Sequence, residues 1–230
     1  MLFSNAFGQE VVAKLEIEKI QEGFYVFTTY QTFKEKPMSA NGMYVVTDEG
    51  VILIDTPWDT TQFQPLLDSI KARHNLDVKL CIGTHSHPDR IAGLEFYADK
   101  GIKTYTSSLT DKISSKYGSP RANNIFMSDT TFTLGNIKLS TFYPGHGHTA
   151  DNIVVWFEES KILFGGCIVK STEAKDLGYV GEANLKSWKK GMKKIKKLYD
   201  PKFIVTGHQN WKDVHSITHT IKLLSIAMKN

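Results

Sequence analysis

The sequence predicts an α/β protein in which two β-sheets pack back to back with helices on their outer faces. The chain has 230 residues, which is enough to bury a substantial core. Segments rich in Val, Ile, Tyr and Phe alternate with helix-like segments, and strands followed by a helix occur in both halves. Neither half has a Pro-rich linker or a low-complexity run. We therefore expect a single domain over residues 11–230.

The first half is expected to form four strands, a helix, a fifth strand and a second helix. Each strand segment is rich in β-branched and aromatic residues, and turns with Gly and acidic residues separate them. Thr60 or Thr61 is a candidate N-cap for the first helix, and Gly101 ends the second. The expected strands are Val11–Lys19, Phe24–Tyr30, Met43–Thr47, Val51–Asp55 and Val78–Ile82, and the expected helices run from Thr60 or Thr61 to about Ala72 and from about Ile91 to Lys100.

The second half repeats this mixture of strands and helices. Its clearest helix has apolar residues at spacings of three and four from Trp188 to Tyr199, which is the period of one helix face. Lysines fill the other face, and a solvated outer face explains them better than a nucleic-acid patch does. The expected strands are Ile102–Tyr105, Phe132–Leu134, Ile137–Phe142, Ile153–Phe157, Ile162–Phe164 and Phe203–Thr206, and the expected helices are Ser108–Lys116, Asn184–Tyr199 and Lys212–Met228.

Composition argues against several classes of protein. The net charge of +4 is too small to indicate a nucleic-acid partner, and no segment is long and apolar enough to span a membrane. We expect no stable membrane association and, because nothing demands an oligomer, a monomer. Residues 1–10 are either the remnant of a signal peptide or a non-native extension. Of the two cysteines, Cys81 is expected to be a buried apolar residue and Cys167 a ligand.

The strongest functional signal is the segment Thr84–Arg90, directly after the expected strand Val78–Ile82. It places His85, His87 and Asp89 within five residues on the loop that leaves the strand. Imidazole and carboxylate are zinc ligands, and a loop at a strand end can turn all three towards one point. In an extended backbone both histidines can bind one ion, while Asp89 points away and can serve a second.

Three further candidate ligands each follow a strand of their own. The segment Gly145–Asn152 offers His146 and His148, and the spacing alone does not choose between them. Cys167 follows two glycines at the end of one strand, and His208 follows another. Six ligands at four strand ends predict a hydrolytic site with two metal ions.

Lys170 lies three residues after Cys167, so a helical turn would bring it back to the same side of the chain. There its ammonium group could bind a carboxylate of a substrate. The alternative is a solvated surface lysine, which its position in a loop would favour.

Taken together, these motifs resemble subclass B1 of the metallo-β-lactamase superfamily, from about Val11 to the C-terminus. Other hydrolases of the superfamily, such as glyoxalase II, have His where this chain has Arg90 and Asp where it has Cys167. The segment Gly178–Asn184 is most similar to the BlaB-like enzymes of flavobacteria. The matching motifs are His-x-His-x-Asp-Arg at His85–Arg90, Gly-His-Thr-x-Asp-Asn at Gly147–Asn152, Gly-Gly-Cys-x-x-Lys at Gly165–Lys170 and Gly-His at Gly207–His208.

The resemblance implies a four-layer αββα sandwich, two zinc ions and a periplasmic location. It implies hydrolysis of the β-lactam amide of penicillins, cephalosporins and carbapenems, and hence antibiotic resistance. Asp89 would also orient the attacking hydroxide and so count among the catalytic residues, as would Lys170. The implied ligands are His85, His87 and His148 for the first zinc and Asp89, Cys167 and His208 for the second.

The resemblance also implies contacts with the β-lactam substrate. Lys170 would pair with the carboxylate of the substrate, and segment Thr29–Ala40, with Phe33, would be a mobile flap over it. Trp58 would add an apolar wall. Tyr179 stands where many B1 enzymes have an Asn that polarises the lactam carbonyl. Either its hydroxyl takes over this task or the first zinc acts alone.

Two other functions are also compatible with parts of this sequence. The first is a superfamily hydrolase that acts on a thioester, lactone or phosphodiester, and the combination of Arg90 with Cys167 disfavours it. The second is a metal-binding or nucleic-acid-binding module without catalysis, which the complete set of six ligands disfavours.

Overall fold

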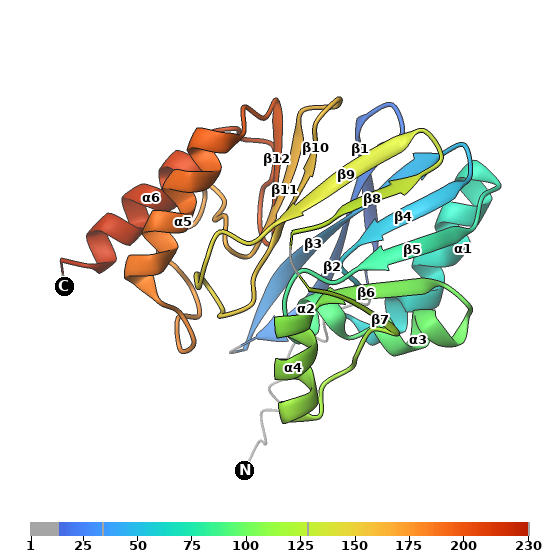
Figure 1. Cartoon of the computed structure of the whole chain (residues 1–230), viewed down its shortest axis with the longest axis horizontal. Coiled ribbons are helices and arrows are strands. Elements are labelled where there is room, and N and C mark those ends of the chain that lie inside the picture. Colours follow the sequence, from blue (N-terminus) through green and yellow to red (C-terminus); the bar gives the residue numbers. More distant parts are fainter. Residues whose placement is uncertain (1–13, 34, 128, 230) are drawn as a thin grey trace, which may run out of the picture.

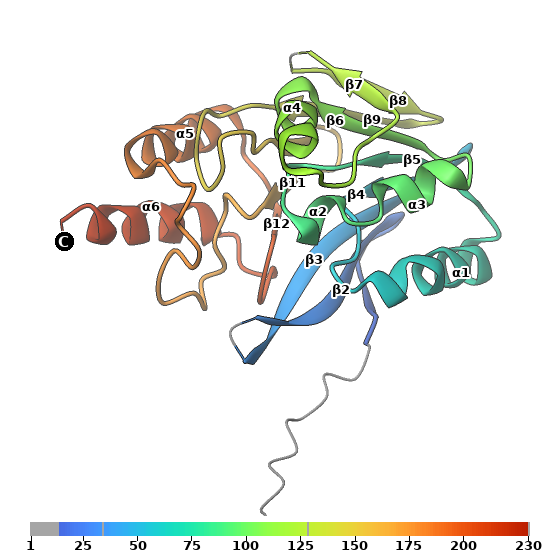
Figure 2. The same cartoon turned by 90° about the horizontal axis from the view of Figure 1, so that it is seen from below.

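The computed structural model describes residues 14–33, 35–127 and 129–229, which form two sheets packed face to face (Figure 1). Helices cover the outer faces of both sheets (Figure 2): α1 (Phe63–His74) and α3 (Leu94–Asp99) on the first, α5 (Leu185–Leu198) and α6 (Ser216–Ala227) on the second. This arrangement confirms the predicted four-layer αββα fold.

The first sheet has seven strands in the order β1-β2-β3-β4-β5-β6-β7. Strands β1 to β4 pair antiparallel through short turns, whereas β4 to β7 pair parallel and need helical connections. This half contains β1 Glu16–Gln21, β2 Phe24–Phe33, β3 Lys36–Thr47, β4 Gly50–Ile54, the 3-10 turn η1 Thr60–Gln62, α1 Phe63–His74, β5 Val78–Ile82, α2 Pro88–Ile91, α3 Leu94–Asp99, β6 Lys103–Ser107, α4 Ser108–Tyr117 and β7 Asn124–Phe126.

The second sheet has five strands in the order β12-β11-β10-β9-β8. Strands β8 to β11 are antiparallel, and α5 carries the chain across to β12, which lies parallel to β11. This half contains β8 Thr131–Leu134, β9 Ile137–Phe142, β10 Val154–Phe157, β11 Ile162–Gly166, α5 Leu185–Leu198, β12 Phe203–Thr206 and α6 Ser216–Ala227.

Apolar side chains from both sheets fill the space between them. Val26 and Ile52 of the first sheet and Val155 and Phe164 of the second are all buried in this central cluster. Two outer clusters attach the helices to the sheets, and Trp188 of α5 is fully buried in one of them. Three apolar layers therefore hold the strand ends, and the loops that follow them, in fixed positions.

The hairpin of β2 and β3 is longer than the sequence predicted. Residues expected to form a flap continue both strands, and the pairing extends to Phe33 opposite Lys36. The reason is that the first half of β3 contains Pro37, Ser39, Asn41 and Gly42, which break the apolar and β-branched pattern on which the strand predictions rested.

Other predicted boundaries need correction. The predicted helix from Ile91 to Lys100 is two short helices that meet at Gly93, where an added Cβ would lie 3.1 Å from Thr56. Asp59, rather than Thr60 or Thr61, caps the η1 turn, because its carboxylate accepts a hydrogen bond from the Thr61 amide. Strand β7 was not predicted.

Two predictions concern the ends and the cysteines of the chain. The predicted leader 1–10 and the first part of the strand Val11–Lys19 lie outside the described residues. Cys81 and Cys167 are both free and buried, as expected for Cys81. Among the described residues, no helix has the length and apolar character needed to cross a membrane.

The two sheets are joined by Asn41 at the rim where the metal-ligand candidates lie. The Asn41 amide N–H donates to the Gly207 carbonyl oxygen at 2.9 Å, and its side chain donates to the Thr206 carbonyl oxygen at 2.9 Å. Strand β3 of one sheet is thereby tied to the end of β12 in the other. Loops from both sheets meet at this rim.

Candidate metal centre

The six side chains predicted as metal ligands lie together at the rim of the two sheets. Their ligand atoms form three overlapping groups, and within each group all atoms lie within 4.8 Å of one another. The groups come from the loop after β5, the loop between β9 and β10, and the ends of β11 and β12. The groups are His85, His148 and Cys167; His85, His87 and Asp89; and Asp89, Cys167 and His208.

The loop after β5 points its ligands in two directions. His87 has an extended backbone, with φ −80° and ψ 150°, and Pro88 then starts α2 at a position that a helix tolerates. Asp89 therefore lies in the first helical turn, where its carboxylate belongs to the second cluster and also lies within 4.8 Å of ligand atoms of His85 and His87. The loop between β9 and β10 also holds this segment in place, because the Ser86 amide donates to Asp151 Oδ2 at 2.8 Å.

Three imidazoles form the first cluster. His87 Nδ1 lies 3.3 Å from His148 Nε2, and the ring of His85 packs edge to face against both. Burial lowers the pKa of His85 and of His148 well below the usual range, so both imidazoles are neutral and keep a lone pair. His85 Nε2 is buried and has no hydrogen-bond partner among the described residues. A buried nitrogen of this kind is suited to a metal ion.

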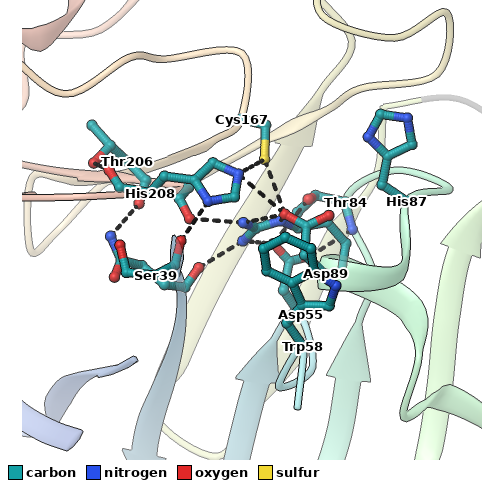
Figure 3. Close-up of polar contacts among 12 residues, drawn as sticks. Ser39, Asp55, Trp58, Thr84, His87, Asp89, Cys167, Thr206 and His208 are labelled. Carbon is teal, nitrogen blue, oxygen red and sulfur yellow. Dashed lines mark hydrogen bonds and ion pairs between the residues drawn. The ribbon is translucent and has the colours of Figure 1, made fainter. Parts of the chain in front are cut away.

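A carboxylate, a thiol and an imidazole form the second cluster (Figure 3). Cys167 Sγ lies 3.5 Å from Asp89 Oδ2 and 3.2 Å from His208 Nε2. His208 Nδ1 donates to the Ser39 carbonyl oxygen at 2.6 Å, which leaves Nε2 to face the other two groups. Burial would lower the pKa of His208, but the negative charges of Cys167 and Asp89 outweigh it and raise the pKa to about 9. Carboxylate, cysteine sulfur and imidazole are all ligand types that bind zinc, so the second cluster is suited to hold a metal ion.

Arg90 holds the Asp89 carboxylate of the second cluster through hydrogen bonds. It is completely buried and donates two hydrogen bonds to Asp89 Oδ2, at 2.7 and 2.9 Å, and one to Asp55 Oδ2 at 3.1 Å. Burial acts to raise the pKa of Asp89, but Arg90 and His208 hold it well below the usual range.

Asp55 has a left-handed φ of 64° and accepts hydrogen bonds from the Thr84 amide and hydroxyl. The pKa of Asp55 is raised by burial to about 6, against the opposing charge of Arg90.

Lys170 lies beside both clusters. A turn between Gly166 and Val169 returns the chain, and the Lys170 ammonium lies 5.4 Å from the ring centre of Trp188. Burial lowers its pKa, and its positive charge helps to lower the pKa of His148. The indole of Trp188 also packs against His148. Trp188 therefore contacts both a predicted ligand and the predicted carboxylate-binding residue.

Aromatic residues flank the centre on two sides. Trp58 packs on the ring of His208, with ring centres 6.2 Å apart, and Phe33 packs on Trp58. On the other side, the half-exposed Tyr179 lies 5.8 Å from the ring of His87. Every residue predicted to contact a substrate thus borders the six ligand candidates.

Two contacts near His87 were not predicted. Glu182 Oε2 lies 3.5 Å from His87 Nε2, and the His146 ring bonds to the Glu182 carbonyl oxygen at 2.7 Å. His146 therefore holds the loop that contains Glu182 and Tyr179, while His148 faces the cluster. Of these two histidines, His148 belongs to a group of side chains that could hold a metal ion, whereas His146 appears in none of the groups formed by the described residues. The sequence held no signal for Glu182, because its loop reaches His87 only through the fold.

Comparisons with known proteins agree with this geometry. The family model of the Metallo-beta-lactamase superfamily matches residues 36–208 of this chain. The chain is 44% identical to "Metallo-beta-lactamase type 2" of Elizabethkingia meningoseptica over 96% of this chain and 89% of that protein. It is 42% identical to metallo-beta-lactamase IND-1 of Chryseobacterium indologenes, over 90% of this chain and 87% of that protein. The solved structure of a metallo-beta-lactamase from Pontibacter korlensis has a TM-score of 0.89 at 38% identity, covering 92% of this chain and 99% of that one.

Proposed function

The chain belongs to the metallo-β-lactamase superfamily, as its motifs predicted, and on that premise we propose that it is a zinc-dependent β-lactamase. It hydrolyses the amide bond of penicillins, cephalosporins and carbapenems and so confers antibiotic resistance. The observation that best supports this function is the convergence of two sets of side chains at one rim: three imidazoles whose rings contact one another, and a carboxylate, a thiol and an imidazole that could hold a metal ion. We further propose residues 11–230 as its single domain.

The ligand spacing fits zinc. A tetrahedral ion with bonds of about 2.0–2.3 Å to its ligands holds neighbouring ligand atoms about 3.3–3.8 Å apart. In the first cluster His87 Nδ1 and His148 Nε2 are 3.3 Å apart. In the second cluster the three distances are 3.5, 3.2 and 3.2 Å. A cysteine sulfur and imidazole nitrogens favour zinc over the hard cations magnesium and calcium, which prefer oxygen ligands. We therefore propose one zinc ion in each cluster.

When bound, the two ions supply a nucleophile from water near neutral pH and stabilise the negative charge that develops on the lactam. Asp89 orients the attacking water. In the described part of the chain all its hydrogen bonds and ion pairs use Oδ2, so Oδ1 remains for this task. The Lys170 ammonium binds the carboxylate of the substrate as a point charge. Tyr179 borders the first cluster and can donate its hydroxyl to the lactam carbonyl.

The aromatic residues on the other side shield the reaction from water. Phe33 lies near the tip of the β2–β3 hairpin and contacts Trp58, which in turn contacts His208. Apolar parts of the substrate would pack on this pair. Exclusion of water strengthens every charge interaction in the site.

The experiment that tests the proposal measures bound zinc per chain together with turnover of a penicillin, a cephalosporin, a carbapenem and a thioester. We expect two zinc ions and rapid turnover of the three β-lactams. Faster turnover of the thioester would instead favour another hydrolase of the superfamily. Nucleic acid is not an expected partner.

Cys167→Ser is expected to weaken zinc binding in the second cluster by about 100-fold or more, because a protonated hydroxyl replaces an anionic soft ligand. The first cluster should keep its ion. Competition with a fluorescent chelator would measure both affinities. Cys81→Ala, a buried cysteine away from the rim, is the matched control and should keep both ions. Unchanged stoichiometry and rate in Cys167→Ser would argue against this ligand.

Lys170→Ala is expected to raise KM about 10-fold or more while lowering kcat less, because the ammonium binds ground state and transition state alike. Steady-state kinetics with a carbapenem would measure both constants. Lys190→Ala on the exposed face of α5 is the control and should change neither. An unaltered KM in Lys170→Ala would remove this residue from the site.

We also propose that the protein acts in the periplasm as a monomer. The similarity of the chain to bacterial metallo-β-lactamases supports the location. Fractionation of cells that express the gene with its native leader, together with light scattering of the purified protein, would test both points.

A further inference from the structure

Lys170, the residue proposed to bind the carboxylate of the substrate, lies at the end of the turn that follows β11. Helices α5 and α6 lie side by side on the outer face of the second sheet (Figure 1), and each contributes a fully buried side chain that contacts this turn. The two side chains are Trp188 of α5 and Thr220 of α6. Lysine has a flexible four-carbon stem, so the position of its ammonium group depends on the groups that hold the residue.

Thr220 holds the backbone of Lys170. Its Oγ1 accepts the Lys170 amide N–H at 2.8 Å and donates to the Ser216 carbonyl oxygen, one turn earlier in α6, at 2.7 Å. The Lys170 carbonyl oxygen lies farther from Oγ1, at 3.5 Å. A hydroxyl has a single proton, so the bond to Ser216 leaves the lone pairs of Oγ1 free to accept the Lys170 amide. Loss of this hydroxyl would therefore leave the Lys170 amide without this partner.

Trp188 holds the same turn from α5. Its indole N–H donates to the Ile168 carbonyl oxygen at 2.8 Å, two residues before Lys170. The Lys170 ammonium lies 5.4 Å from the ring centre of Trp188, which is within the distance at which an aromatic face attracts a cation. The same ring packs against His148, with ring centres 5.8 Å apart. One side chain therefore contacts the backbone of the turn, the ammonium group and a ligand candidate of the first cluster.

We propose that Thr220 and Trp188 are positioning residues, which hold the Lys170 ammonium group where the carboxylate of a β-lactam reaches it. This inference rests on the proposed function of Lys170. Both side chains are completely buried, so they act through Lys170 rather than on the substrate. Thr220 gives the cleaner test, since replacement of Trp188 also disturbs His148.

The test compares Thr220→Val, which has nearly the same shape but no hydroxyl, with Thr220→Ser, which keeps the hydroxyl. Steady-state kinetics of the zinc-loaded protein would use a penicillin and its methyl ester, which lacks the carboxylate charge. We expect Thr220→Val to raise KM for the penicillin about 5-fold with a smaller change in kcat, and to change neither constant for the ester. Thr220→Ser should keep most of the original KM. A merely structural role would affect both substrates alike, and this result would overturn the proposal.

Two further variants separate this inference from the proposed function. In a Lys170→Ala background, Thr220→Val should have little additional effect on KM, because the group that it positions is gone. Thr110→Val in α4 removes another fully buried, hydrogen-bonded hydroxyl and is the matched control, which should leave KM unchanged. An increased KM in Lys170→Ala with an unaltered KM in Thr220→Val would refute the positioning role alone. An unaltered KM in Lys170→Ala would refute the role of Lys170, and this inference with it.

Trp188→Phe keeps the proposal testable if Thr220→Val does not fold. This variant retains an aromatic ring against His148 but loses the N–H bond to the Ile168 carbonyl oxygen. Bound zinc per chain would be measured first, to show that the metal ions remain. We expect KM to rise about 3-fold or more for the penicillin and not for its methyl ester. Equal changes for the two substrates would contradict a role in positioning the ammonium group.

Discussion

Removal of metal by dialysis against a strong chelator is expected to lower kcat/KM for a carbapenem by about 1000-fold or more, a loss of about 4 kcal/mol of transition-state stabilisation. Zinc should restore the rate. The physical reason is that the remaining groups cannot replace the ions. Burial keeps His85 and His148 neutral, so neither can stabilise a developing negative charge as a cation would.

The metal-free protein should remain folded, and this makes the experiment informative. The three apolar clusters that hold the sheets and helices together do not include the six ligand candidates. Near-ultraviolet circular dichroism of the chelated protein would check that tertiary packing persists. A metal-free sample, verified by elemental analysis, that still hydrolyses the antibiotic at the original rate would defeat the proposed mechanism.

Much of the fold follows from local sequence, because burial of one or both faces of a strand leaves a pattern of apolar residues. The segments Val78–Ile82, Ile137–Phe142 and Phe203–Thr206 were predicted as strands with the bounds they have in the structure. Each is a short run that contains β-branched or aromatic residues. The lysine-rich α5 was also predicted within one residue at each end, because its apolar stripe has a clear helical period.

The ligand candidates could be found because each follows a strand, and strand ends meet at a common rim. The groups that support them could not be found in the same way. Trp188 was predicted only as part of an apolar helix face, yet its ring contacts both Lys170 and His148. Glu182 and the carbonyl of Ser39 reach His87 and His208 from distant loops. Such contacts depend on the packing of two sheets, which no local pattern encodes.

Arg90→Leu is expected to reduce the free energy of unfolding by about 3–5 kcal/mol and the melting temperature by about 10 °C, the second large effect that the structure predicts. The guanidinium is completely buried between Asp89 and Asp55, and these two carboxylates would lose their common cation. It also donates to the Asn41 and Gly207 carbonyl oxygens at 2.6 and 2.7 Å, which joins β3 to the residue before His208. Thermal and urea unfolding with excess zinc would measure the loss.

Arg121→Leu is the matched control for this prediction. Arg121 also makes two hydrogen bonds to a carboxylate, that of Asp111, at 2.7 and 2.9 Å, but its side chain is 48% exposed. Water can replace this partner, so the control should lose no more than about 1 kcal/mol. A double variant Arg90→Leu/Asp55→Asn should be less destabilised than the sum of its single changes, since it removes one of the stranded charges. Equal losses in Arg90→Leu and Arg121→Leu would show that burial does not set the cost of breaking these pairs.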